Sequence, residues 1–182
     1  MGPVAPLRAF ASGLLFILGC ATLSGCNDVA ADPPNGDARP QFVRRDDANM
    51  AAATVAIVSV DGAPADLSAH FNQSLAEAAG ERKIAVVDPP TARYLVRGYL
   101  TATQIEGGAE VDLVWDIFTP DKQRAQRLSD AIAVRGAGDD AWTIIGDAGL
   151  DSVAGKSADD LAAYLSNTPE AAPGAAALSY AQ

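Results

Sequence analysis

The sequence is poor in the side chains that most metal sites and hydrolytic active sites need. Its 182 residues include two cysteines and a single histidine, His70. A structural zinc site takes four cysteine or histidine ligands, and a catalytic histidine needs a nucleophile or an orienting acid beside it. No G-x-S-x-G serine motif accompanies His70, and no D-x-D-x-D-G run offers the oxygen ligands of a calcium loop. The sequence therefore predicts neither a cofactor or metal centre nor an enzyme.

A phosphate-binding loop is also lacking. The one similar stretch, "GLDSVAGKS" at residues 149–157, has five residues between its first glycine and Gly-Lys-Ser. A P-loop has four, because its backbone N–H groups must wrap a phosphate of fixed size. We therefore expect no nucleotide binding. Lys156 and Ser157 are expected to begin a C-terminal helix instead.

Basic residues are in the minority. The chain has 13 lysines and arginines against 23 aspartates and glutamates, a net charge of −10. Arg8 is the only charged residue among the first 25, so the rest of the chain carries a net charge of about −11. Such a chain repels nucleic acid and anionic lipid surfaces. Neither is expected as a partner.

Near the start, residues 9–24 ("AFASGLLFILGCATLS") form an apolar segment without a charge, preceded by Arg8. A basic residue followed by an apolar stretch of this length is typical of a secretory signal peptide. The segment is shorter than the ~20 residues that a transmembrane helix needs. We expect export.

The stretch "LSGC", from Leu23 through Ser24 and Gly25 to Cys26, resembles the lipobox of bacterial lipoproteins. The resemblance implies cleavage between Gly25 and Cys26 and attachment of lipid to the cysteine thiol, whose thiolate form is the nucleophile. An alternative, "ILGC" ending at Cys20, fits less well because a bulky leucine occupies a small-residue position. Cleavage before Cys26 would leave the mature domain without a free thiol or a disulfide.

The lipid would anchor the protein in a membrane with its domain facing the periplasm. In the lipoproteins that the motif resembles, an aspartate directly after the cysteine retains the protein at the inner membrane. Asn27 holds that place here, so the resemblance implies the outer membrane, with the inner membrane as the alternative. Residues 1–25 are thus expected to be a signal peptide and 26–52 a flexible tether reaching ~25–30 Å. An α/β domain should follow at 53–167. Residues 168–182 are expected to be a disordered tail.

Hydrophobic periodicity predicts the elements of that domain. Residues 53–60 form a β-branched apolar run that predicts a buried strand. A helix should follow from Pro64 to Gly80, with a C-terminal glycine, and then a short strand within "KIAVVDPP" at 83–90. Residues 93–105 and 110–119 alternate around a glycine turn and predict an antiparallel hairpin, and 123–134 predict a third strand of the meander.

One or two helices should close the domain, with a break near Gly155. The acidic pairs 139–140 and 159–160 should then lie near helix starts, where they favour the helix dipole. The class is therefore α/β (α+β), in the order β-α-β-β-β-α. We expect a single mixed sheet of about five strands with helices packed on one face.

Part of this pattern resembles the amino-terminal domain of the periplasmic protein TolB and the α/β domains of lipoproteins that activate penicillin-binding proteins. The resemblance implies the fold class, and TolB's propeller has no counterpart in this chain. It rests on a loose set of matching positions in the meander: Tyr94, Val96, Gly98, Val111, Leu113, Asp116 and Pro120.

Alternation along the meander predicts a partner-binding patch on the sheet face that the helices leave open. Aromatic side chains beside charged ones suit a protein contact, whereas a solvated face with cross-strand ion pairs would show the same pattern. The six residues of this predicted patch are Arg97, Tyr99, Asp112, Val114, Asp116 and Phe118.

These features favour a non-catalytic lipoprotein that serves as an accessory module of a cell-envelope complex and binds an envelope protein. Two alternatives stay open. The alanine-rich helices could leave space for a small apolar ligand, which would make the protein a carrier or sensor. The protein could also be a structural lipoprotein that associates with itself.

Overall fold

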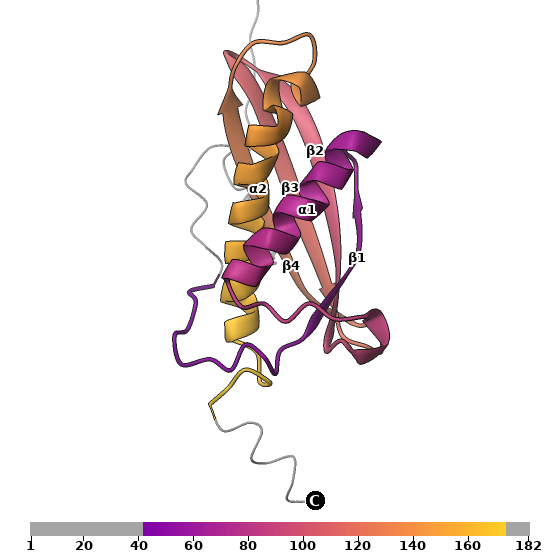
Figure 1. Cartoon of the computed structure of the whole chain (residues 1–182), viewed down its shortest axis with the longest axis vertical. Helices are drawn as coiled ribbons and strands as arrows, with labels where there is room; N and C mark the ends of the chain where they lie inside the picture. Colours follow the sequence, from indigo (N-terminus) through magenta and orange to yellow (C-terminus); the bar gives the residue numbers. More distant parts are fainter. Residues whose placement is uncertain (1–41, 174–182) are drawn as a thin grey trace, which may run out of the picture. The chain divides into compact units, whose positions relative to one another are not determined.

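The computed structural model describes residues 42–173, which form one mixed sheet and two long helices (Figure 1). The elements follow in the order β1 (Val55–Asp61), α1 (Ala65–Glu81), η1 (Pro89–Thr91), β2 (Tyr94–Ile105), β3 (Gly108–Phe118), β4 (Arg124–Arg135) and α2 (Ala141–Ser166). The sheet order is β1-β2-β3-β4, with β1 and β2 parallel and the other pairs antiparallel. This confirms the predicted α+β class and the β-α-β-β-β-α order.

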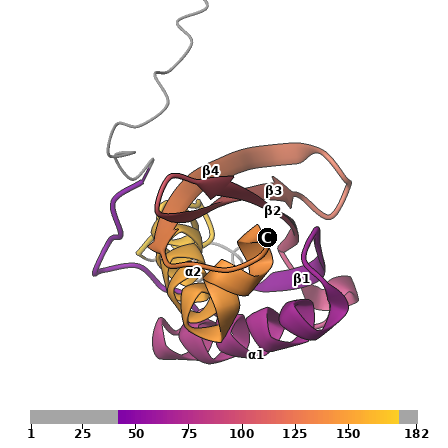
Figure 2. The same ribbon diagram turned by 90° about the horizontal axis from the view of Figure 1, so that it is seen from above.

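Both helices lie on the same side of the sheet, which curves around them when it is seen from above (Figure 2). The inner face of β3 is formed by the alternating apolar residues, all buried, that the sequence placed together: Val111, Leu113, Trp115 and Ile117. The opposite face of the sheet carries no helix of the described chain, and we call it the open face.

The sheet has four strands rather than the five predicted. Within the stretch at 83–90, Val86 forms only an isolated bridge to Val55. Pro89 and Pro90 follow at once in the 3₁₀ turn η1. Because proline lacks a backbone N–H group, it cannot donate to a strand ladder, so the pairing ends after a single bridge.

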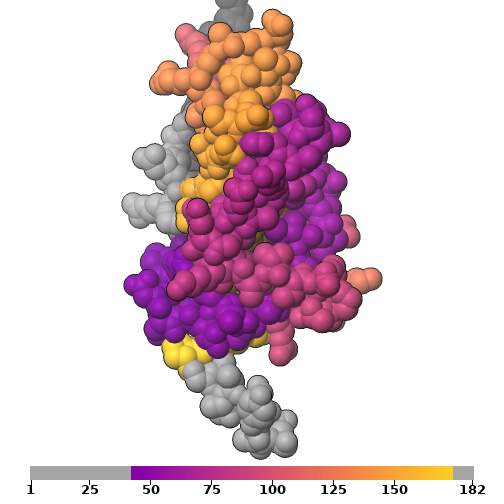
Figure 3. Space-filling model, in the orientation of Figure 1, coloured from indigo at the N-terminus to yellow at the C-terminus, as the bar shows by residue number. Residues whose placement is uncertain are grey.

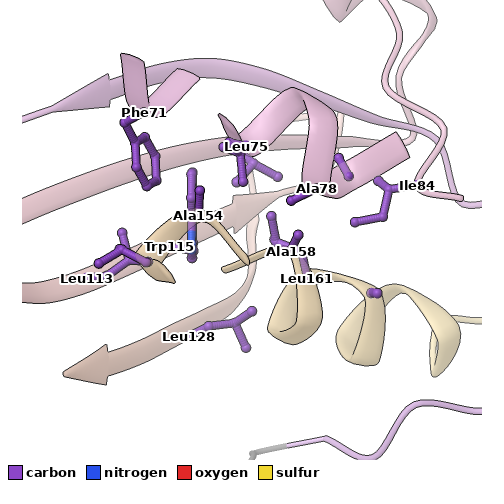
Figure 4. Close-up of a cluster of buried hydrophobic side chains, with 14 of the residues drawn as sticks. Phe71, Leu75, Ala78, Ile84, Leu113, Trp115, Leu128, Ala154, Ala158 and Leu161 are labelled. Atoms are coloured by element: carbon purple, nitrogen blue, oxygen red, sulfur yellow. The ribbon is translucent and has the colours of Figure 1, made fainter. Parts of the chain in front are cut away.

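The core fills the layer between sheet and helices (Figure 4). Phe71 and Leu75 from α1 converge with Leu113 and Trp115 from β3, and all four side chains are at most 2% exposed. On α2 the side chains facing this layer are mostly small, as at Ala154. Small side chains here allow the two helices to pack closely against each other and against the sheet.

The predicted break in the last helix lies at the wrong glycine. Gly146, with φ 52° and ψ −170°, interrupts α2, whereas Gly155 lies inside the helix. A glycine inside a helix costs only about 1 kcal/mol, which tertiary packing of α2 readily offsets. Lys156 and Ser157 are therefore interior residues of α2, and the Ser157 hydroxyl donates to the Val153 carbonyl at 2.7 Å.

The two acidic pairs have different outcomes. The pair at 139–140 lies at a helix start, as predicted. Asp140 is the N-cap of α2 and accepts a hydrogen bond of 3.0 Å from the Thr143 backbone N–H. Such a cap satisfies one of the free donors at the helix start. Asp159 and Asp160 lie within α2, so their predicted place at a helix start is wrong, because the break expected near Gly155 does not occur.

The packed region extends beyond both expected boundaries at 53 and 167. The Arg45 backbone N–H donates to the Ser166 hydroxyl at 3.0 Å, and the Asn49 backbone N–H donates to the Ala171 carbonyl at 2.9 Å. The ring of Phe42 packs edge-on against Tyr164 with centroids 5.4 Å apart. The entry segment after residue 42 therefore lies against the domain, as the space-filling view shows in indigo (Figure 3).

Candidate functional site

Strand register brings the six residues of the predicted patch onto the open face. On β2, Tyr94, Val96 and Gly98 are buried toward the helices, so the alternate residues lie on the opposite side. Arg97 then pairs with Asp116, and Tyr99 with Val114. Phe118 and Asp112 occupy the same face, opposite Leu95 and Thr101 respectively.

Asp116 is committed to a contact within the sheet. The residue is only 5% exposed. Arg127 donates two hydrogen bonds to its carboxylate, from Nε to Oδ1 at 2.7 Å and from Nη2 to Oδ2 at 2.6 Å. Arg124 lies 4.0 Å from the same carboxylate. Hydrogen bonds from Arg127 hold the pKa of Asp116 below its usual range, against the opposing effect of burial. At Asp116 the geometry is therefore that of a cross-strand ion pair, the alternative to a partner contact that the sequence had left open.

This pair predicts a pH effect on folding. A carboxyl group whose pKa is lowered in the folded state adds stability above its unfolded pKa of about 3.9, and that stability is lost as the pH falls through the folded pKa. Asp116→Asn should therefore flatten the acid side of the stability profile below about pH 5. Urea unfolding of the native protein and the variant between pH 7 and pH 3 measures how the free energy of unfolding depends on pH. Asp112→Asn, on the same face but without an ion pair in the described chain, is the control, and an equal flattening there would contradict the assignment.

The open face carries an apolar hollow of about 290 Å³ at its β1 side. Val58, Leu95 and Phe118 line its apolar part, while Arg97 and Lys122 line its polar part. The β1–β2 register shifts between Ile57 and Ser59, so Val58 is an extra residue at a bulge and is 42% exposed. A bulge can redirect a side chain in this way. We call these five residues the apolar hollow.

The β3–β4 turn holds Lys122 beside the hollow. The Thr119 backbone N–H donates to the Gln123 carbonyl at 2.9 Å, and the Lys122 backbone N–H donates to the Thr119 carbonyl at 2.9 Å. The Thr119 hydroxyl also donates to Asp121. Lys122 has a φ of 64°, a left-handed conformation that costs free energy in a residue with a side chain. The turn thus places this lysine at a defined position.

Charge is distributed unevenly over the open face. Arg97 and Lys122 form no side-chain ion pair or hydrogen bond with another residue between 42 and 173, whereas Arg124 and Arg127 share the one carboxylate of Asp116. The opposite end of the face carries acidic residues on β3, Glu110 and Asp112. The end around the apolar hollow is therefore basic, although the chain as a whole is acidic.

Three residues of the hollow, namely Val58, Leu95 and Lys122, were not part of the predicted patch. Val58 lies in a run that reads as a buried strand, and nothing local marks the bulge. Lys122 belongs to a turn whose distance from β1 is set only by the fold. Leu95 could have been found, because strict alternation from Tyr94 already places it on the same face as Arg97.

A second polar cluster joins the two helices. His70 Nε2 lies 2.9 Å from Asp151 Oδ1, and the Ser74 hydroxyl donates to that same oxygen at 2.6 Å. Hydrogen bonds from Ser74 and then from His70 lower the pKa of Asp151. The serine proton therefore points to the acid and not to the histidine, unlike a nucleophile–base pair. Sequence reasoning missed Asp151, which is 81 residues from His70.

Residues 42–173 contain neither a membrane-spanning helix nor a cluster of metal-binding side chains. Neither of their helices combines the length and the apolar character that crossing a bilayer requires. No group of three or more His, Cys, Asp or Glu side chains among them is arranged to hold a metal ion.

No protein-family model and no curated protein sequence matches the chain. Solved structures show a partial similarity. The PelC dodecamer from Paraburkholderia phytofirmans superposes with a TM-score of 0.43 and 13% sequence identity, covering 62% of this chain and 89% of PelC. A point variant of the same dodecamer also gives a TM-score of 0.43, with 15% identity over 62% of this chain and 88% of the variant. Protein XCC0632 from Xanthomonas campestris, assigned to the family DUF330, superposes with 0.45 at 10% over 69% and 90%.

Similarities of this extent assign neither a family nor a function to the chain. The expected likeness to TolB and to activators of penicillin-binding proteins finds no support among them.

Proposed function

We propose that this chain is an envelope lipoprotein, anchored in a membrane through lipid on Cys26, whose α/β domain is a non-catalytic binding module for a periplasmic protein. The observation that carries the proposal is the uncharged segment at 9–24 followed by the lipobox-like "LSGC". These residues lie outside the part that the structure describes. The outer membrane is the proposed location.

The open face supports the binding role. Four apolar side chains on or beside it are partly exposed: Val58 at 42%, Tyr99 at 39%, and the half-buried Leu95 and Phe118. Exposed aromatic and aliphatic residues bordered by arginines are the composition of many protein contacts. A carrier holding its ligand between sheet and helices is less well supported, since side chains such as Trp115 and Phe71 are completely buried in that layer.

The anchor is tested by replacing Cys26 with alanine in the full-length protein expressed in a bacterial envelope. We expect the protein to lose incorporation of labelled palmitate and to leave the membrane fraction, because one thiol carries the whole attachment. Cys20→Ala is the matched control and should stay membrane-bound. If Cys26→Ala remains in the membrane and labelled, the anchor is elsewhere and the proposal fails.

The binding role is tested separately by site-specific photocrosslinking in cells. A photoreactive residue at Tyr99 or Val114 should yield a discrete adduct with an envelope protein, because both lie on the open face. The same residue at Asn72 on α1, exposed on the helical side, is the control and should yield none. Absence of adducts from the open face would remove the binding role while leaving the anchor intact.

A further inference from the structure

We infer that the apolar hollow binds an acidic, extended peptide segment of the partner protein, which inserts an apolar side chain against Val58, Leu95 and Phe118 and places carboxylates on Arg97 and Lys122. This inference rests on the proposed function and names the chemistry of its partner.

The apolar part of the hollow requires an apolar side chain in the bound segment. Val58 is 42% exposed, and Leu95 and Phe118 are only partly buried. Removing such surface from water favours binding in proportion to the apolar area buried. A hollow of about 290 Å³ lies at the lower end of the ligand-pocket range. It therefore suits one or two side chains rather than a large ligand.

The two basic side chains of the hollow, Arg97 and Lys122, require acidic groups in the bound segment. Acidic residues outnumber basic ones nearly two to one in this chain, yet neither Arg97 nor Lys122 has an acidic partner within residues 42–173. A guanidinium and an ammonium on the same rim favour carboxylates, with the planar arginine suited to a bidentate contact. Carboxylates of the bound segment would supply the missing partners.

The acidic end of the open face sets the direction of binding. Glu110 and Asp112 lie on β3 away from the hollow, on the part of the face that pairs with Thr103 and Thr101. They would repel a second acidic stretch there. Complementary charge therefore favours the orientation that places the acidic residues of the segment at the hollow. In the reversed orientation they would lie beside Glu110 and Asp112, where Arg135 is the basic side chain on β4.

The shape of the apolar surface favours a polypeptide over a single small group. Leu95 pairs with Phe118 and Tyr99 pairs with Val114, and these two apolar pairs are separated by the charged row of Arg97, Asp116 and Arg127. Four residues along a strand span about 13 Å at ~3.3 Å per residue. Apolar contacts at this interval, with charges between them, match the alternating side chains of an extended chain.

The test uses the full-length, lipidated protein in neutral-detergent micelles and a fluorescent ten-residue peptide. The peptide has a leucine and a phenylalanine four positions apart, so that both point to the same side of an extended chain, with aspartates before the leucine and between the two. Fluorescence anisotropy should show binding that weakens at least tenfold in the double variant Arg97→Glu/Lys122→Glu. Arg135→Glu is the matched control, since it makes the same kind of charge change on the same face, opposite Gly108. It should bind like the native protein, and thermal unfolding of each variant checks that the fold is retained.

Two peptide controls and one lipid probe complete the test. Replacing the aspartates by lysines, or the leucine and the phenylalanine by serines, should each abolish binding. Equal binding by the lysine peptide, or by the double variant, would overturn the inference. Phosphatidylglycerol vesicles that displace the peptide and themselves require Arg97 and Lys122 would assign the hollow to a lipid headgroup and overturn it as well. Crosslinks from Tyr99 that persist while the peptide fails to bind would overturn the inference and leave the proposed function standing.

Discussion

Replacing Trp115 by alanine will lower the free energy of unfolding by about 3–5 kcal/mol, as deletion of a large buried aromatic side chain typically does. Trp115 is 1% exposed at the centre of β3. Its ring lies over Gly98 of β2, where any Cβ atom would come within 2.5 Å of the indole carbon Cζ3. A loss of this size is a large part of the roughly 5–15 kcal/mol that stabilises a typical domain. Urea unfolding followed by far-UV circular dichroism measures it.

Trp115→Phe is the informative companion. The buried indole Nε1 has no hydrogen-bond partner in the described part of the protein, and an unsatisfied buried donor costs about 1–3 kcal/mol. Phenylalanine removes that donor and keeps most of the apolar volume, so this variant should lose less than half as much stability as Trp115→Ala. An equal loss in both variants would show that the indole N–H is satisfied in solution.

Gly98 supplies a further check on the same contact. Gly98→Ala forces a methyl group against the indole ring and should cost about 1–3 kcal/mol through overpacking. The cost should shrink in the Trp115→Phe background, because the smaller ring leaves room for the methyl group. Strictly additive effects in this double-mutant cycle would mean that the two residues do not share the contact.

Removing Lys156 will expose a repulsion between two carboxylates. Lys156 Nζ lies 2.7 Å from Asp130 Oδ2 on β4 and 2.7 Å from Asp160 Oδ2 on α2. Their side chains are 12% and 20% exposed. Breaking a buried pair by deleting one partner costs about 3–5 kcal/mol. Because the lysine is itself 39% exposed, solvent screening reduces the loss expected for Lys156→Ala to about 2 kcal/mol.

The pH dependence of this variant has a defined sign. Burial raises the pKa of Asp160, and Lys156 partly opposes that rise. Without the lysine the pKa of Asp160 rises further. A carboxyl group with a raised folded pKa contributes stability at low pH, which is lost as the pH rises through that pKa. The deficit of Lys156→Ala should therefore shrink as the pH falls from 7 to 5. Lys83→Ala, at an exposed position, is the control, and a deficit that grows on acidification would contradict the prediction.

The order of elements and the inner face of the sheet could be predicted from local sequence patterns. Alternation along β2 and β3 and the helical spacing in α1 encode burial locally, since side-chain direction follows from strand or helix period. For the same reason all six residues of the predicted patch lie together on the open face. Within the patch, however, alternation could not show that Asp116 is already paired with Arg127.

Features that depend on residues far apart in the chain could not be predicted from local patterns and follow from the packing of the folded domain. Packing of α2 against the sheet and α1 kept the helix continuous through Gly155, although a local rule predicted a break. The bridge between Val55 and Val86 and the contact between His70 and Asp151 likewise join segments that no local pattern connects. The apolar hollow needs a bulge in β1, two strands and a turn at once. Its chemistry arises where these elements meet, because hydrophobic period specifies which face a side chain occupies but not which distant side chain it meets there.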